Sequence, residues 1–74
     1  MRITDLKVGE SAVIQSIGKG MLANKLMEMG CLPGETIEVT YKAPLGGPIA
    51  INVFGYILGI RREEADFLEV EKCS

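Results

Sequence analysis

The residues of this sequence best suited to chemistry are five carboxylates near its end. They are Glu63, Glu64, Asp66, Glu69 and Glu71. Such a cluster could attract a divalent metal ion, but carboxylate oxygens alone hold a transition metal weakly, and the facial triad of non-haem iron sites needs two histidines. The sequence contains no histidine. We therefore interpret the cluster as a solvated acidic face and predict no metal site.

The two cysteines do not change this interpretation. Cys31 and Cys73 lie far apart in the sequence and form no CxxC or CxxH pattern. They would add metal ligands only if folding brought them close to the carboxylates. Cys31 stands between Gly30 and Leu32 in a turn-like corner, and we expect it to be a small buried hydrophobe.

Catalysis is the function that the sequence disfavours most. Histidine, the commonest general base, is missing, so no serine or cysteine nucleophile has its usual activator. Gly18-Lys19-Gly20 precedes a predicted helix and could suggest a phosphate site, but it lacks the spacing of a phosphate-binding loop. We interpret it as a strand-to-helix turn. Arg61 and Glu64 are expected to form a local pair across one helical turn. The chain is predicted to be no enzyme and to hold no cofactor.

Length and composition are those of one small globular domain. The 74 residues are 47% hydrophobic and 24% charged, a balance that favours a folded domain over a disordered segment. The net charge of −2 comes without the basic stripe that nucleic-acid binding requires. The uncharged run 43–60 is interrupted by glycines and prolines, which favours strands and turns over a membrane span. No signal-like segment opens the sequence, so we expect residues 1–74 to form a single cytoplasmic domain.

A hairpin is the element around which the other segments must be arranged. Residues 36–43 alternate, with Ile37, Val39 and Tyr41 expected on the buried face, and residues 48–54 repeat the same period of two. Glycine and proline between them predict the tip of the hairpin. The tip residues are Leu45, Gly46, Gly47 and Pro48.

The remaining segments are expected to close this hairpin into a mainly β fold. Further strands are predicted at 11–17, 56–60 and 67–71, with a bulge near Gln15 and Ser16. Five short strands of this kind predict a closed or nearly closed barrel, whose closure would remove exposed strand edges.

Helical segments are short and few. A helix at about 21–29 is predicted to dock through Leu22, Leu26 and Met29, with Ala23 and Met27 widening the same face, and to end at Gly30. A helical turn is predicted at about 61–66. A further short turn, which carries Ile3 and Leu6, is expected to plug one end of the core.

The outward-facing residues are the most informative about function. If Ile51 and Val53 are core, then Phe54 faces away, and Ile57 does so if Leu58 is core. Neighbouring strands could bring Phe54 and Ile57 together in an exposed apolar patch, which predicts an interaction surface. The alternative is that the helix covers both residues. The hairpin tip is a second candidate contact, because an exposed loop on a rigid barrel often carries function.

Four segments of the sequence, taken in order, resemble one protein family. They are Leu26-x-Glu28-Met29-Gly30 with Leu32-Pro33-Gly34, Ala43-Pro44-Leu45-Gly46-Gly47-Pro48-Ile49, Gly55-Tyr56-x-Leu58, and Arg61-x-x-Glu64-Ala65. They are similar to segments of FeoA-type proteins, cytoplasmic accessories of bacterial ferrous iron transport. The resemblance implies an SH3-like β-barrel, which is also similar to the C-terminal domain of iron-dependent repressors of the DtxR type.

The same resemblance implies a partner, a FeoB-type permease with a cytoplasmic G domain and a membrane channel. It implies a non-enzymatic role through protein contact, without insertion into the membrane. Two alternatives stay open: an Fe²⁺-binding sensor or chaperone domain, and a small barrel that binds nucleic acid. A second copy of the chain is an alternative partner for the exposed patch.

Overall fold

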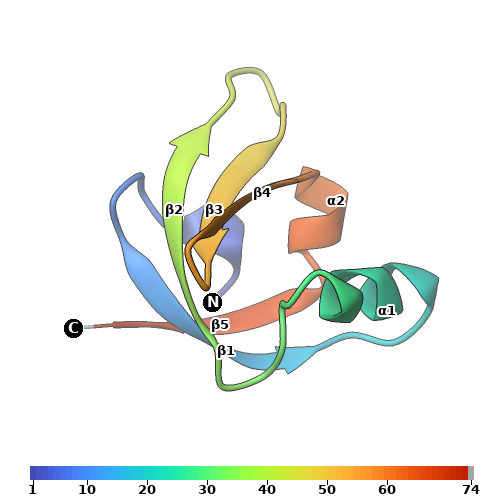
Figure 1. The fold of residues 1–74 in the computed structure, drawn as a ribbon. Coiled ribbons are helices and arrows are strands. Elements are labelled where there is room, and N and C mark those ends of the chain that lie inside the picture. Colours follow the sequence, from blue (N-terminus) through green and yellow to red (C-terminus); the bar gives the residue numbers. More distant parts are fainter. Residues whose placement is uncertain (74) are drawn as a thin grey trace.

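The computed structural model describes residues 1–73, which form one antiparallel sheet with short helical segments at its ends (Figure 1). In chain order the elements are the 3-10 turn η1 (Ile3–Asp5), β1 (Ser11–Ile17), α1 (Met21–Glu28), β2 (Thr36–Lys42), β3 (Ile49–Val53), β4 (Tyr56–Ile60), α2 (Arg62–Ala65) and β5 (Leu68–Lys72). The predicted five strands, short helix and helical turn are confirmed, and their predicted bounds differ from the observed ones by at most one residue.

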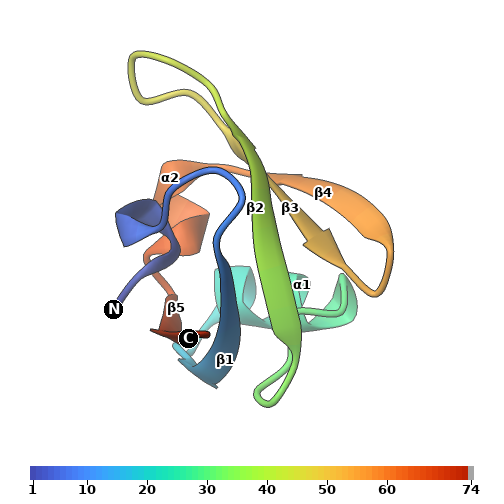
Figure 2. The same ribbon diagram turned by 90° about the vertical axis from the view of Figure 1, so that its left-hand side faces the viewer.

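The five strands form a curled sheet in the order β4-β3-β2-β1-β5, with antiparallel neighbours throughout. β1 and β5, which pair with each other, lie below the β2–β3 hairpin, and the core lies between these two parts of the sheet (Figures 1 and 2). Within residues 1–73, β4 and β5 do not pair with each other. The expectation that barrel closure removes every strand edge is therefore wrong, because β4 and β5 each keep one side without a neighbouring strand.

The core is built from the inward-facing residues of all five strands, with η1 and α1 covering its ends. Ile3 and Leu6 are fully buried, as predicted for a plug. The largest fully buried side chains are Ile3, Leu6, Ile14, Leu26, Cys31, Ile37, Val39, Ile49, Ile51, Val53, Ile60 and Leu68. Removing this apolar surface from water is the main source of stability.

Two bulges interrupt the alternation of the strands. The register of β1 against β5 shifts between Ile14 and Ser16, which confirms the predicted bulge. A second shift lies between Val39 and Tyr41 of β2 and was not predicted. Because the extra residue moves each later side chain to the other face, Tyr41 is 56% exposed instead of buried.

Lys42 shows the consequence of the second bulge. It pairs with the buried Ile49, so it lies on the core face of β2. Simple alternation along the strand had predicted that it lies on the outer face. Its Nζ donates hydrogen bonds to the carbonyl oxygens of Thr4 (3.0 Å) and Leu6 (2.9 Å). The lysine therefore fastens the η1 segment to β2.

Helix α1 ends in a Schellman motif, as Gly30 had predicted. Gly30 has φ of +101° and donates its N–H to the Met27 oxygen at 3.0 Å, and Cys31 donates to the Leu26 oxygen at 3.0 Å. The predicted docking face is partly wrong, because Ala23 and Leu26 are buried whereas Leu22 is 38% exposed. Burial in this short helix follows the side that meets the core, where Ala23 and Leu26 lie, and Leu22 falls at the margin of that side.

Gly18 permits a close approach between the end of β1 and the start of β5. Its N–H donates to the Phe67 oxygen at 2.8 Å, and a Cβ at this position would lie 2.6 Å from Phe67 Cδ1. We expect Gly18→Ala to cost about 1–3 kcal/mol of unfolding free energy by overpacking, measured by urea denaturation. Gly59→Ala is the control, because a Cβ there meets nothing within 4 Å. Equal stabilities of the two variants would contradict this account.

Candidate interaction surfaces

Both connections of the β2–β3–β4 meander contain tight turns with the same unusual backbone. In the first, Gly47 donates its N–H to the Pro44 oxygen at 3.2 Å, and the two residues between them, Leu45 and Gly46, have φ of +58° and +76°. In the second, Val53 pairs with Tyr56 across a two-residue turn of Phe54 (φ +55°) and Gly55 (φ +85°). Positive φ at both central residues is the requirement of a type I′ turn.

The first central residue of each turn breaks the usual rule for this geometry. Type I′ turns favour Asn, Asp or Gly there, because left-handed backbone is costly for bulky side chains. Within residues 1–73, Leu45 and Phe54 are the only non-glycine residues with positive φ. Neither offsets this cost by deep burial, since Leu45 is 104% and Phe54 is 64% exposed. Residues held in unfavourable backbone regions cluster at functional sites, so the pair marks candidate contact residues.

The six residues predicted as contacts fall on two separate surfaces. Leu45, Gly46, Gly47 and Pro48, which we call the β2–β3 tip, project from one end of β3 (Figures 1 and 2). Phe54 and Ile57, which we call the β3–β4 corner, lie at the other end of the same strand. One compact patch that contains all six residues is therefore ruled out.

The β3–β4 corner is exposed and rests on the end of α1. Ile57 pairs with Asn52 and is 60% exposed. The Phe54 ring lies against Gly30, where a built Cβ would be 3.7 Å from Phe54 Cδ2. The helix end thus supports one face of the ring without covering it. Asn52 Oδ1 accepts a hydrogen bond from the Gly55 N–H at 2.9 Å, which fixes the turn that presents Phe54.

The carboxylates near the end of the chain do not form one acidic face. Glu64 is only 5% exposed. Its Oε1 accepts the Arg61 backbone N–H at 2.8 Å, and its Oε2 lies 3.4 Å from Lys25 Nζ. The predicted pairing with the Arg61 side chain is therefore replaced by a backbone cap and a lysine. The Arg61 hydrogen bond is the main cause that lowers the pKa of Glu64, and the charge of Lys25 adds to it.

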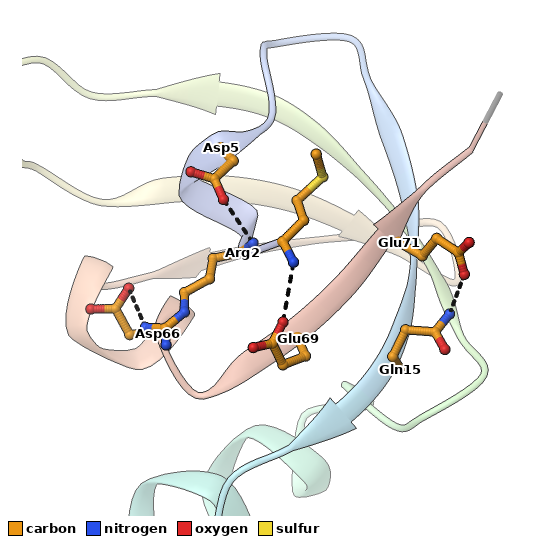
Figure 3. A network of polar contacts seen from close by, with 7 residues as sticks. Arg2, Asp5, Gln15, Asp66, Glu69 and Glu71 are labelled. Carbon is orange, nitrogen blue, oxygen red and sulfur yellow. Dashed lines mark hydrogen bonds and ion pairs between the residues drawn. The ribbon is translucent and has the colours of Figure 1, made fainter.

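Three of the other four carboxylates, all except Glu63, have separate partners (Figure 3). Asp66 lies 3.6 Å from Arg2, Glu69 pairs with the N-terminal amine at 3.2 Å, and Glu71 accepts from Gln15 at 3.2 Å. Within the part of the chain that the structure describes, no three His, Cys, Asp or Glu side chains gather as a metal site would require.

Cys31 behaves as predicted, as a small buried hydrophobe. It is fully buried and occupies the position after the C′ glycine, where a Schellman motif places an apolar residue against the helix. Burial raises the pKa of its thiol, which disfavours the reactive thiolate.

Sequence reasoning named Leu45 and Phe54 but missed what makes them unusual. Both stand directly before a glycine between two alternating runs, and this X-Gly pattern is the signal of a type I′ hairpin turn.

Within residues 1–73, no helix is long and apolar enough to cross a membrane.

Within residues 1–73 this geometry defines a class, a small SH3-like barrel whose exposed apolar residues lie in turns and on a strand edge. Comparison with known proteins identifies the family. The family model described as "FeoA domain" matches residues 1–72, and the chain belongs to this family of non-catalytic accessory domains.

Relatives support the assignment in sequence and in structure. A fusion protein of Porphyromonas gingivalis, described as Fe(2+) transport protein A joined to the Fe(2+) transporter FeoB, is 39% identical over 75 residues, which cover 100% of this chain and 9% of that protein. The solution structure of iron(II) transport protein A from Clostridium thermocellum superimposes with a TM-score of 0.92 at 40% identity, over 97% of this chain and 45% of that chain. The chain therefore spans less than half the length of these relatives.

Two further solved structures have the same fold as this chain. FeoA of Stenotrophomonas maltophilia, described as an SH3 domain protein complexed with zinc, matches with a TM-score of 0.84 at 28% identity, over 96% of this chain and 89% of that chain. The SH3-like fold is thereby confirmed. IdeR of T. acidophilum matches with a TM-score of 0.85 at 23% identity, over 99% of this chain and 34% of that chain, which shows a shared fold alone.

Proposed function

We propose that this chain is a non-enzymatic accessory of ferrous iron transport that acts by direct contact with a FeoB-type permease. The observation that carries the proposal is the Porphyromonas gingivalis fusion protein, in which a segment related to the whole of this chain is joined to FeoB. Joining two modules on one polypeptide raises their effective concentration for each other. Such an arrangement supports an association between the separate proteins as well.

The proposal includes where and how the contact is made. Residues 1–74 act as one cytoplasmic domain and meet either the G domain or the membrane portion of the permease. The contact residues are those of the β2–β3 tip and the β3–β4 corner. Support comes from their exposure and from the left-handed backbone of Leu45 and Phe54, because a partner that covers these side chains would gain apolar burial that the free protein lacks.

Asparagine substitutions separate binding from folding at both surfaces. Asparagine is favoured in left-handed backbone, so Phe54→Asn and Leu45→Asn are each expected to keep the unfolding free energy within about 1 kcal/mol. Loss of an aromatic anchor that the permease would bury should nevertheless weaken binding of Phe54→Asn to the permease by at least roughly tenfold. Leu45→Asn tests the second surface in the same way.

The measurement is a titration of each variant with full-length permease in nanodiscs, without and with a GTP analogue. Thr40→Asn is the matched control, since Thr40 is a half-buried residue of β2 outside both surfaces. Binding of the unchanged protein, together with equal affinities of both variants and the control, would reject these surfaces. No binding of the unchanged protein to the permease would reject the proposed function itself.

A further inference from the structure

The two outer strands of the sheet are protected to very different degrees. The free side of β5 is covered by the start of the chain: Val70 donates its N–H to the Met1 oxygen at 2.8 Å, and Arg2 forms a β-bridge with Glu69. Figure 3 shows these first residues lying along β5. β5 also carries charged side chains, which discourage pairing with another strand.

Within residues 1–73, β4 has no such backbone partner on its free side and no charged side chain. Its five residues are Tyr56, Ile57, Leu58, Gly59 and Ile60, without a charge or a proline. It pairs with β3 in continuous register without a bulge. Charges, prolines, bulges and covering segments are the usual means by which proteins block an exposed strand edge. β4 is therefore an open edge that is suited to receive another strand.

The register identifies the backbone groups that this edge offers. Val53 and Tyr56 flank a two-residue turn, so they form a hydrogen-bonded pair, and such pairs alternate along an antiparallel ladder. Ile57 and Gly59 therefore direct their N–H and C=O groups away from β3. Within residues 1–73, neither residue has a hydrogen-bond partner on that side. Both residues are exposed.

We propose that β4 pairs antiparallel with β4 of a second copy of this chain, around a two-fold axis at Leu58. In this register Ile57 of each copy faces Gly59 of the other. Both residues direct their backbone groups outward, so each of the two Ile57–Gly59 pairs exchanges two hydrogen bonds, about four in all. An isologous contact of this kind closes after two copies.

The side chains and charges of the strand fit this occupant. Gly59 leaves open space, since a Cβ there meets nothing within 4 Å, and the 60% exposed Ile57 of the facing copy can lie over it. The strand carries no charge, so two identical copies approach without like charges opposite each other. Arg61, which follows β4, comes opposite Gly55 of the other copy and beside its Phe54, a placement that suits a cation–π contact.

The size of the contact sets the expected strength. One pair of five-residue strands buries far less than the roughly 800 Å² per partner of a standard stable interface. We therefore expect a weak dimer, with a dissociation constant on the order of 0.1–1 mM. The pairing involves the free protein alone and does not rest on the proposed role in transport.

Sedimentation equilibrium between about 20 µM and 2 mM, which brackets this dissociation constant, tests the proposal. Ile57→Lys introduces the charge that protected edges carry and should weaken dimerisation at least roughly tenfold. Tyr41→Lys is the matched control, because Tyr41 is similarly exposed but lies on β2, an inner strand, and should leave the dimer unchanged.

Hydrogen exchange identifies the groups involved. The Ile57 and Gly59 amides should become protected as the concentration of the protein rises. A monomer throughout the range, or a dimer that survives Ile57→Lys, would overturn the proposal. Protection of these two amides only after a permease is added would also overturn it, because the edge would then belong to a different partner.

Discussion

Leu26→Ala is expected to lower the unfolding free energy by about 2–5 kcal/mol, the range for leucine truncation in a packed core. Leu26 is fully buried, and its carbonyl accepts the Cys31 N–H that closes the Schellman motif. Folded domains of this size have total stabilities of only about 4–11 kcal/mol. A large share of the variant should therefore be unfolded in moderate urea, which circular dichroism at increasing urea concentrations would measure.

The matched control for this prediction is Leu22→Ala in the same helix. Leu22 is 38% exposed, so its truncation should change the stability by no more than about 0.5–1 kcal/mol. The amphipathic pattern of the sequence had assigned both leucines to one buried face. Equal losses for the two variants would support that pattern and contradict the observed docking of α1.

Glu64→Ala should lower the unfolding free energy by about 1.5–3 kcal/mol, the range for a hydrogen bond to a charged group. The carboxylate caps the first turn of α2 by accepting the Arg61 N–H, and it contacts Lys25 of α1. Its loss leaves the N–H without this acceptor and removes the ion pair between α2 and α1. Glu63→Ala is the control, because Glu63 is exposed and should change little.

The cost of Glu64→Ala should depend on pH. The Arg61 hydrogen bond and Lys25 lower the pKa of Glu64 in the folded state below its ordinary value of 4.5. The stabilisation is therefore fully present above that ordinary value and is lost as pH falls through the lower folded pKa. The difference in unfolding free energy between the two proteins should shrink in acid.

Denaturation at a series of pH values checks this dependence. Glu10, whose pKa is lowered chiefly by its hydrogen bond with Lys72, is present in both proteins and cancels from the difference. A difference that stays constant or grows below the ordinary pKa would show that Glu64 does not act as an ionised cap.

The period of two in the sequence was sufficient to locate the strands. It was insufficient to predict which side chains after a bulge point into the core. Ile37 and Val39 are buried as their alternation predicts, but Tyr41 and Lys42 exchange faces after the register shift. A bulge depends on how two strands meet and carries no reliable signal within one of them. Likewise, Leu22 is exposed because the position of α1 on the sheet, and not its own pattern, decides which residues are covered.

The candidate contacts show the same division between local and long-range information. Alternation was enough to place Phe54 on the outward face, and the glycine- and proline-rich tip was enough to name Leu45 as an exposed loop residue. Their left-handed backbone follows from the register of the flanking strands, which the sequence does not state directly. Glu64 was taken for a solvated residue, because only the folded chain brings Lys25 of a different helix to it.

The cover that the first residues provide for β5 has a consequence for how the domain is synthesised and folds. Met1 contacts Glu69, 68 positions away, so this part of the structure must wait until the last strand has left the ribosome. Closing so long a loop is entropically costly and slows folding relative to domains with mostly local contacts. During synthesis Met1 and Arg2 therefore lack their β5 partners while β1 to β4 emerge, although η1 can already dock on β2 through Lys42.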